Sequence, residues 1–429
     1  MTPVALRVTE TGGRSATTRH IPPKLALAVG MPSTPAPKNW RWAALTELAR
    51  LESGHTPSRR HPEYWGGNIP WIGIQDAKAN DGRRIQDTEE KTNELGIENS
   101  SARVLPENTV CLSRTASVGY VVVMGRPMAT SQDFVNWVCS KQLDHNFLKY
   151  LFIAEDEDLL RFSSGAVHQT IYFPEVKAFH ICHPSFPEQQ RIVGILDEAF
   201  EGIATAKANA EKNLQNARAL FESHLQSVFS QRGEGWVETT IGEVCILRSG
   251  TTLPKEIEKP SGEIAYLKVA DMNISENLNG VTCSSRYVNK SDVNASNLLP
   301  VGTTIFPKRG GAILTNKKRL TERVICADLN IIGVTPKNGL LPEFLFNFFL
   351  RLDLREINNG SSIPQINNYS IEPLLIAFPR STTEQKTIVV KLESLSEETQ
   401  RLASLYERKL AALDALKKSL LHQAFTGQL

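Results

Sequence analysis

The sequence predicts an α+β protein in which two tandemly repeated α/β domains are separated by a long antiparallel coiled coil of two helices, with pseudo-two-fold symmetry. Three observations predict this fold. Two long runs without proline carry apolar residues at alternating steps of three and four. These runs align without a gap at an offset of 196 residues, and the segments that precede them align at nearly the same offset.

The first long helix is expected over 188–230, directly after the helix-breaking Pro184 and Pro187. At ~1.5 Å per residue it would be roughly 65 Å long. A helix of this length with one narrow apolar seam needs a partner helix. The expected seam contains Leu196, Ala199, Ile203, Ala206, Ala210, Leu214, Ala217, Phe221, Leu225 and Val228.

The second long helix, expected over 384–425, is that partner. Both runs begin with Glu-Gln and both carry a phenylalanine near their ends, at Phe229 and Phe425. We therefore expect the two helices to pair side by side and antiparallel. The expected seam of the second helix contains Ile388, Leu392, Leu395, Leu402, Leu405, Lys409, Leu413, Leu416, Leu420 and Ala424.

Each long helix follows a globular segment with matching motifs. ELARLESGHTPS at 47–58 matches EVCILRSGTTLP at 243–254, and GNIPWIGIQD at 67–76 matches GEIAYLKVAD at 262–271. The chain is therefore expected to be a tandem duplication.

Short β-branched and aromatic runs predict the strands of both domains, and longer apolar runs predict a helix in each. The expected strands are 69–74, 109–112, 120–123, 134–139, 264–269, 303–306 and 324–334. The expected helices are 146–162 and 342–357.

These patterns predict five segments along the chain. Residues 1–38 are polar and proline-rich and are expected to be a tail without an assigned function. The first globular domain is expected over 39–185, its helix over 186–231, the second domain over 232–380 and its helix over 381–429.

Composition favours a cytoplasmic protein. No apolar run reaches the ~20 residues of a membrane span, and the N-terminus has no signal-peptide core. The six cysteines are scattered without a C-x-x-C motif, which fits a reducing compartment better than disulfides or zinc. The net charge of +2 means that a nucleic-acid binder would need local basic patches.

Two similar domains on a stiff spacer suit a long periodic ligand. Duplex DNA presents equivalent major-groove faces about 34–36 Å apart, one helical turn. The alternative is that the coiled coil simply joins two domains, and geometry by itself leaves that alternative open.

Five motifs in order carry a family resemblance. They are S-G-H-T-P at 53–57, Y-W-G-G-N-I-P-W-I at 64–72, P-E-Q-Q-R-I at 187–192, T-E-Q-K-T-I at 383–388, and the C-terminal L-L-H-Q-A-F-T-G-Q-L at 420–429. From about Trp40 to Leu429 the chain resembles the DNA-specificity subunit of type I restriction-modification systems. The second half departs from the first, with S-G-T-T-L-P at 249–254 and Tyr266 in place of Trp71, so the loop geometry of the halves is free to differ.

The resemblance implies a binding subunit whose partners catalyse. Each domain would read one half of a split, asymmetric site on double-stranded DNA, and the helices would dock two modification (methyltransferase) subunits, joined by restriction subunits. No cofactor would be bound by this chain, whereas S-adenosylmethionine, ATP and Mg²⁺ would belong to the partners. The hypothesis for the reaction is that the methyltransferases flip one adenine in each half-site.

The motifs of catalysis are absent from the sequence. There is no N-P-P-Y or D-P-P-Y for adenine methylation, no G-x-G-x-x-G and no G-x-x-x-x-G-K-[ST]. The run His180, Cys182 and His183 has metal-ligand residue types but no fourth ligand nearby, so a structural role is expected. The sequence thus predicts a chain that is not an enzyme.

Basic, glycine-containing loops are the expected DNA contacts, since phosphates bind Lys and Arg, and base edges bind Arg, Asn and Gln. The loop that begins at Arg114 and the loop that begins at Lys308 are expected at matching positions. The alternative, solvated surface charge, stays open for each residue. The DNA-contact candidates are Thr56, Arg59, Arg60, Gln75, Lys78, Arg83, Arg84, Arg114, Lys308, Arg309, Lys317, Lys318 and Arg319. The linkers at 163–169 and 360–365 are interpreted equally as DNA-facing segments or as hinges.

Apolar residues of the long helices outside the seam are candidate docking positions for the modification subunits, namely Phe200, Leu220, Phe229 and Tyr406. The alternative is packing against the chain's own domains. A different class of protein, a scaffold whose two domains bind protein partners, also remains an alternative for the whole chain.

Overall fold

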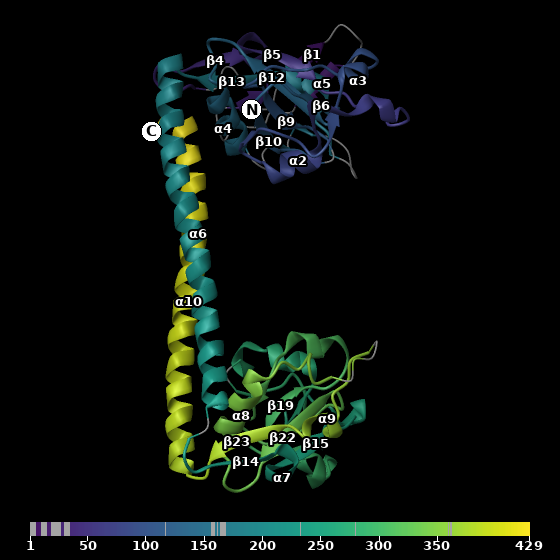
Figure 1. The fold of residues 1–429 in the computed structure, drawn as a ribbon, viewed down its shortest axis with the longest axis vertical. Coiled ribbons are helices and arrows are strands. Elements are labelled where there is room, and N and C mark those ends of the chain that lie inside the picture. The colour runs from purple at the N-terminus through teal and green to yellow at the C-terminus, as the bar shows by residue number, and fades with distance from the viewer. Residues whose placement is uncertain are drawn as a thin grey trace. The chain divides into compact units, whose positions relative to one another are not determined.

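The computed structural model describes residues 6–9, 15–18, 27–29, 35–115, 117–155, 159–160, 162–163, 169–231, 233–278, 280–358, 360 and 363–429. It divides into two compact units. Unit 1 comprises Met1–Asn209 and Lys409–Leu429, and unit 2 comprises Ala210–Arg408. Each unit contains one α+β domain and part of each long helix, as Figure 1 shows by colour. The predicted fold class is confirmed.

Unit 1 contains a five-stranded sheet in the order β5-β12-β9-β10-β7, two three-stranded sheets, β11-β6-β8 and β3-β13-β4, and the pair β1-β2. Its strands are β1 (Leu6–Thr9), β2 (Ser15–Thr18), β3 (Leu27–Val29), β4 (Arg41–Ala44), β5 (Ala49–Ser53), β6 (Trp65–Ile72), β7 (Arg84–Ile85), β8 (Lys91–Thr92), β9 (Val110–Ser113), β10 (Val121–Met124), β11 (Ala129–Thr130), β12 (Phe134–Cys139) and β13 (Phe179–His183). Its short helices are α1 (Leu45–Leu48), α2 (Ile74–Ala79), α3 (Glu94–Glu98), α4 (His145–Glu155) and α5 (Phe173–Lys177).

Unit 2 contains two four-stranded sheets, β15-β22-β19-β20 and β17-β16-β21-β18, and the pair β14-β23. Its strands are β14 (Trp236–Thr240), β15 (Cys245–Ser249), β16 (Ile264–Leu267), β17 (Tyr287–Val288), β18 (Leu298–Leu299), β19 (Thr304–Pro307), β20 (Arg319–Leu320), β21 (Ile325–Ala327), β22 (Ile331–Pro336) and β23 (Leu375–Pro379). Its short α-helices are α7 (Ile241–Val244), α8 (Pro342–Arg351) and α9 (Asn368–Ile371).

The two domains share one architecture, as the sequence repeat predicts. The order β5-β12-β9 recurs as β15-β22-β19, and the parallel pair β11–β6 recurs as β21–β16. Register is kept as well, because Ala49 pairs with Cys139 where Cys245 pairs with Pro336. Since a slip of one residue would turn every side chain to the opposite face, the shared register means that equivalent residues face equivalent sides.

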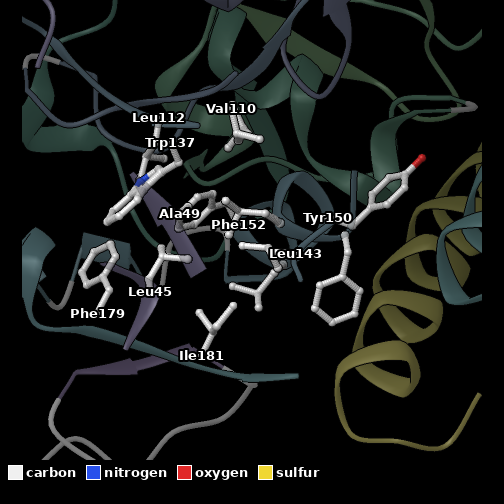
Figure 2. Close-up of a cluster of buried hydrophobic side chains, with 14 of the residues drawn as sticks. Leu45, Ala49, Val110, Leu112, Trp137, Leu143, Tyr150, Phe152, Phe179 and Ile181 are labelled. Carbon is white, nitrogen blue, oxygen red and sulfur yellow. The ribbon is translucent and has the colours of Figure 1, made fainter. Parts of the chain in front are cut away.

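Each domain core extends onto the long helices. In unit 1 the sheet residues Leu112 and Trp137 and the α4 residue Phe152 form a buried cluster, drawn in Figure 2, in which Tyr150 lies at the edge with its hydroxyl directed away. The same cluster includes Leu196 and Leu421 of the long helices. In unit 2 the corresponding cluster joins Phe344 of α8 to residues of both long helices, including Phe229 and Leu392.

The long helices are α6 (Phe186–Ser230) and α10 (Thr382–Phe425), each two residues longer at its start than predicted. They are antiparallel in both units. In unit 1 Arg191 bonds to Leu429 and Lys207 to Asp414, and in unit 2 Arg218 bonds to Glu407. The predicted pairing is therefore confirmed within each unit.

The predicted seam of α6 is confirmed, but that of α10 is wrong over its middle. Leu405 and Leu416 are 44% and 46% exposed, and Lys409 is exposed too. The covered side of α10 instead includes the buried Thr399 and the half-buried Tyr406 and Leu410. Two neighbouring apolar rows of α10 both fit the 3–4 spacing, and only packing against α6 selects between them.

A buried glutamine fixes the start of each long helix. The side chains of Gln189 and Gln385 are fully buried, and each donates two hydrogen bonds to carbonyl oxygens and accepts one from a backbone N–H. The partners are Gln142, Pro184 and Asp144 for Gln189, and Gly339, Pro379 and Leu341 for Gln385. Each amide thus ties a helix to the strand before it and to the loop before α4 or α8, without leaving a buried polar group unpaired.

Two sequence predictions need correction. The expected tail contains β1 (Leu6–Thr9), β2 (Ser15–Thr18) and β3 (Leu27–Val29), and β3 pairs with β13. The expected strand 324–334 is two strands, β21 and β22, which belong to different sheets. In both places the outcome depends on which strand edge is available for pairing, which local composition does not report.

Candidate nucleic-acid interface

The loop that follows β5 in unit 1, and its equivalent after β15 in unit 2, lie directly on a neighbouring backbone. The His55 and Thr251 N–H groups donate to the carbonyl oxygens of Thr130 (2.9 Å) and Ala327 (2.8 Å). A Cβ at Gly54 would lie 1.9 Å from the Ser131 oxygen, and one at Gly250 would lie 2.1 Å from the Asp328 oxygen. Only glycine fits at either position, which explains the repeated Ser-Gly.

An aromatic donor holds both loops at the same point. Trp71 Nε1 donates to the His55 carbonyl oxygen at 3.1 Å, and Tyr266 Oη donates to the Thr251 carbonyl oxygen at 3.0 Å. The sequence has Trp71 in one domain and Tyr266 in the other, so the two loops were free to differ in geometry. Both side chains nevertheless anchor the loop at the equivalent carbonyl oxygen. The two side chains are chemically distinct but place a donor at the same distance.

The basic residues Arg114 and Lys308 occupy equivalent backbone positions. Their N–H groups donate to Asp133 (2.7 Å) and Asn330 (2.8 Å), and their carbonyls accept from Ile171 (2.8 Å) and Ile366 (2.9 Å). The expected correspondence between the two loops is thus present in the backbone.

The side chains of this pair bond within their own domains. Arg114 Nη2 donates to the Gln132 carbonyl oxygen at 3.0 Å, and Lys308 Nζ donates to Ser249 Oγ at 2.7 Å. Partial burial lowers the pKa of both groups. The two cations therefore hold the loops in place, and their N–H groups are already partly occupied by hydrogen bonds to residues of the same domain.

The first-domain candidates Thr56 and Arg59 are also held by neighbours. Thr56 bonds to Gln132, the residue whose carbonyl Arg114 contacts. Arg59 makes a bidentate pair with Glu90 at 2.5 and 2.6 Å and lies 3.8 Å from the centre of the Trp65 ring. This arrangement fixes the plane of the guanidinium, and Glu90 raises the pKa of Arg59.

Gln132 and Trp65 are site residues that sequence reasoning missed. Gln132 lies in a short polar segment between the strands β11 and β12. This polar segment is the feature of the sequence that could have indicated a site residue here. Trp65 lies inside a motif of the resemblance, but its stacking under Arg59 has no signature in the sequence.

The remaining first-domain candidates fall into two groups. Gln75 and Lys78 on α2, with Arg60 and Arg83, are exposed, and no side-chain bond is found for them among the described residues. Arg84 is instead bonded to Glu107 (3.1 Å), Asn108 (2.6 Å) and His145 of α4 (3.1 Å). Arg84 therefore joins a contact group around the start of α4, distinct from the Thr56–Gln132 group.

In unit 2 the candidates differ in availability. Arg309 is exposed and, within the described part of the chain, has no side-chain partner. Lys317 bonds to Asn273, and Arg319 donates to the Lys318 carbonyl oxygen at 2.8 Å. Arg309 is thus the most available cation of this set.

Lys318 has to be withdrawn as a DNA contact. Its side chain is 3% exposed, and its ammonium donates to Asn316 Oδ1 at 2.7 Å and to the Leu352 carbonyl oxygen. Burial lowers the pKa of Lys318 to about 8. The residue ties the 316–320 segment to the end of α8, a structural role that its basic sequence neighbours concealed.

The family model of the type I restriction modification DNA specificity domain matches residues 37–215 and 233–407, once for each repeat. The chain belongs to this family. Its role is accordingly that of the DNA-specificity component of a type I restriction-modification system. The repeat that the sequence analysis found corresponds to the two family domains.

Relatives in the specificity-subunit family match most of the chain. The type I restriction enzyme MjaIX specificity subunit of Methanocaldococcus jannaschii is 24% identical over 417 residues, which cover 92% of this chain and 94% of the relative. The EcoprrI specificity subunit of Escherichia coli is 22% identical over 355 residues, 79% of this chain and 83% of the relative.

Solved structures share the fold. A chain from a structure concerning complex assembly and conformational transition of the type I system has a TM-score of 0.73 at 18% identity, covering 92% of this chain and all of that chain. The HsdS subunit of Thermoanaerobacter tengcongensis has a TM-score of 0.61 at 18% identity, covering 93% of this chain and all of the other.

Two of the four docking candidates of this specificity-family chain pack against its own domains, one of them buried and one half-buried. Phe229 is 8% exposed and its ring centre lies 5.2 Å from that of Phe344. Phe200 is half-buried, 5.4 Å from Tyr150. Phe229 is therefore corrected to intramolecular packing, the alternative that the sequence left open, whereas the half-buried Phe200 stays a docking candidate. Leu220 is 52% exposed, and Tyr406 is half-buried in the seam.

The His180, Cys182 and His183 run has internal partners. His180 Nδ1 lies 2.9 Å from the Ala178 carbonyl oxygen, and His183 Nδ1 lies 2.9 Å from that of Pro184. Burial lowers the pKa of His183. Among the described residues, no group of three His, Cys, Asp or Glu side chains is arranged to hold a metal ion.

The two linkers and the expected absence of a membrane span are the remaining predictions. Of the linkers 163–169 and 360–365, residues 164–168 and 361–362 lie outside the described residues. Across the described ranges, none of the helices combines the length and the apolar character that crossing a bilayer requires.

Proposed function

We propose that the two domains of this specificity chain bind the two halves of a bipartite, asymmetric DNA site. The observation that carries the proposal is one scaffold with two different surfaces. The Ser-Gly loops share their glycine and their aromatic anchor, but the next residues are His55-Thr56-Pro57 in one domain and Thr251-Thr252-Leu253 in the other. Equivalent positions with different side chains would read different sequences.

The available cations supply the phosphate contacts in this proposal. The side chains of Arg60, Lys78 and Arg83 in unit 1 and Arg309 in unit 2 reach solvent and have no bonded partner within the described residues. Arg59, Arg114 and Lys308 hold loops in shape, and Gln75 and Thr56 are retained as candidate base contacts. Lys317, Arg319 and Arg84 are retained as secondary phosphate contacts.

Under this proposal the chain itself is not catalytic, and its partner subunits carry out the catalysis. Two modification subunits and the restriction subunits would dock on it, and those partners would bind S-adenosylmethionine, ATP and Mg²⁺. An adenine flipped from each half-site would be methylated by the modification subunits. Leu220, exposed on α6, supports the docking part of the proposal, whereas Tyr406 is half-buried in the seam and does not support it. The six free cysteines support a reducing, cytoplasmic setting.

Charge reversal and salt dependence test DNA binding. Arg60→Glu and Arg309→Glu should each weaken binding to duplex DNA and reduce the slope of log K against log salt by about 0.9 for each phosphate that the variant no longer neutralises. The matched control is Lys212→Glu, an exposed lysine on α6, which should leave both quantities unchanged. Equal effects of all three variants would contradict the assignment of these arginines to phosphates.

The same measurement separates this function from that of a protein scaffold. Phosphate binding releases counterions and therefore weakens steeply with salt, whereas docking between proteins does not. Mapping methylated adenines in the source genome with and without the gene would then show whether the site has two parts.

A further inference from the structure

The residue at the tip of the turn between β11 and β12 has a direct counterpart in the second domain. It is Gln132 in unit 1 and Leu329, between β21 and β22, in unit 2. Each tip lies between a carbonyl that the Ser-Gly loop contacts and a carbonyl that the basic loop contacts. These carbonyls belong to Thr130 and Asp133 in unit 1 and to Ala327 and Asn330 in unit 2. No residue is inserted between the two bonds, so the tips are equivalent.

The same local hydrogen bond closes both turns. The Asp133 N–H donates to Ser131 Oγ at 3.2 Å, and the Asn330 N–H donates to Asp328 Oδ1 at 3.0 Å. Bonds of this kind, from a side chain to the backbone two residues on, stabilise a tight turn. The residue between each pair is exposed in unit 1 and half-buried in unit 2. Each domain therefore presents one side chain at this tip.

In unit 1 the side-chain amide of Gln132 is held at one end. Thr56 Oγ1 donates to Gln132 Oε1, and Arg114 Nη2 donates to the Gln132 backbone carbonyl at 3.0 Å. No partner is found for Gln132 Nε2 among the residues that the structure describes. The oxygen end of the amide is thus fixed, and the Nε2 end keeps two N–H donors for a ligand.

An amide held in this way differs from a free glutamine in what it can recognise. A free glutamine pairs with adenine through its oxygen and its nitrogen together. Once Thr56 engages Oε1, the Nε2 donors fit the acceptors of the major groove, which guanine, adenine and thymine present at N7, O6 or O4. Cytosine presents the N4 donor there instead. Leu329 has neither a donor nor an acceptor in its side chain, so the two domains differ in chemistry at one equivalent position.

We propose that Gln132 determines specificity, its Nε2 donating to a base acceptor in the half-site that unit 1 binds, with Thr56 as the positioning residue for the amide. One position of that half-site would then reject cytosine. Leu329 places no such requirement on the other half-site. This inference rests on the proposed function, in which each domain binds one half of a bipartite site.

Base selection from a pool of duplex DNA tests the assignment. The full-length chain is mixed with duplexes that have a randomised central segment, and the bound duplexes are sequenced. Gln132→Glu keeps an oxygen for the Thr56 hydroxyl but replaces the Nε2 donor with an acceptor, which suits cytosine N4. The preference at one position of one half-site should therefore shift toward cytosine by about fivefold or more, the effect of one mismatched base pair. The other half-site should be unchanged.

Two sets of variants separate a base contact from charge and from structure. Gln86→Glu makes the same change at an exposed glutamine of unit 1 outside the Ser-Gly and basic loops, and it should leave the selected sequence unchanged. Thr56→Val removes the positioning hydroxyl and should weaken the preference at the same base position, whereas Thr56→Ser keeps the hydroxyl and should retain it. A merely structural Thr56 would lower the unfolding midpoint of the valine variant without changing base preference.

Three outcomes would overturn the proposal. The first is an unchanged selected sequence in Gln132→Glu, and the second is the same shift in Gln86→Glu, which would indicate an effect of charge. The third is altered preference in both half-sites. If Gln132→Glu is unfolded, the comparison of Thr56→Val with Thr56→Ser decides instead, and equal base preference in those two variants would contradict the proposal. Selection of no sequence by the natural chain would contradict the proposed function itself, and this inference with it.

Discussion

Single residues decide the shape of the recognition loops. Gly54 and Gly250 allow a close backbone approach that no other residue permits, and Trp71 and Tyr266 hold the same two loops by one hydrogen bond each. The side chains beyond these anchors then differ between the domains. The shared residues thus carry the structure, and the variable neighbours carry the difference in surface.

We expect Gly54→Ala to destabilise unit 1, because the new Cβ would lie 1.9 Å from the Ser131 oxygen and the backbone would have to move. The cost should be about 1–3 kcal/mol, as for overpacking elsewhere. The matched control is Gly194→Ala in α6, where nothing lies within 4 Å of the new Cβ. That variant should be neutral or more stable by up to ~1 kcal/mol. Urea unfolding of both variants measures the difference, and equal midpoints would refute the steric argument.

Lys318 makes stability depend on pH in a defined direction. Its folded-state pKa is about 8, below the ordinary value of 10.5, so the folded protein releases this proton first as the pH rises. Between these two values the unfolded chain binds more protons, and the contribution of Lys318 to stability increases with pH. Below pH 8 the cost of burying the charge is fully present.

Comparison with Lys318→Met isolates this effect from other titrating groups. The stability of the natural chain relative to the variant should improve between about pH 7 and about pH 10, within the window set by the two pKa values. Unfolding midpoints at both pH values measure it. A difference independent of pH would show that folding does not lower the pKa of Lys318.

At the scale of elements, the apolar pattern of a long helix can predict the helical period correctly and still predict the wrong buried face. The α6 seam matches its prediction, whereas α10 turns Leu405 and Leu416 to solvent and covers Tyr406. The surface ion pairs Lys207–Asp414 and Arg218–Glu407 fit the observed face, but exposed pairs of this kind contribute only about 0–1 kcal/mol. Packing of the covered rows therefore sets the register.

Two leucines of α10 in unit 1 distinguish the observed face from the predicted one. Leu421 is 6% exposed, and Leu421→Ala should cost about 2–5 kcal/mol through reduced burial and a new cavity. Leu416→Ala removes the same atoms from a largely exposed site and should change stability by no more than ~0.5 kcal/mol. The predicted seam requires the reverse order, so thermal unfolding of the two variants decides between the faces.

At the scale of the whole molecule, each unit has its own core, and both cores include residues of both long helices. The chain therefore folds as two units that do not coincide with its sequence repeats, since each unit contains one domain with parts of α6 and α10. A defect in one core should remain within its own unit.

Hydrogen exchange read by mass spectrometry tests this division. Leu421→Ala should reduce amide protection in Met1–Asn209 and Lys409–Leu429, and Leu392→Ala, at a site 1% exposed, should reduce it in Ala210–Arg408. Loss of protection throughout the chain in either variant would mean that the units unfold together.

From sequence alone, the duplication, the α+β class, the two long helices, the start of both helices within two residues and the equivalence of Arg114 and Lys308 were all predictable. These features are repeated or periodic, so neighbouring residues report them. Tertiary structure decided the rest: β3 beside β13, the covered face of α10, the burial of Lys318 and the covering of Phe229. Each of these depends on which distant surface lies opposite a residue, and a linear pattern of hydrophobicity and charge has the same form whether that surface is protein or water.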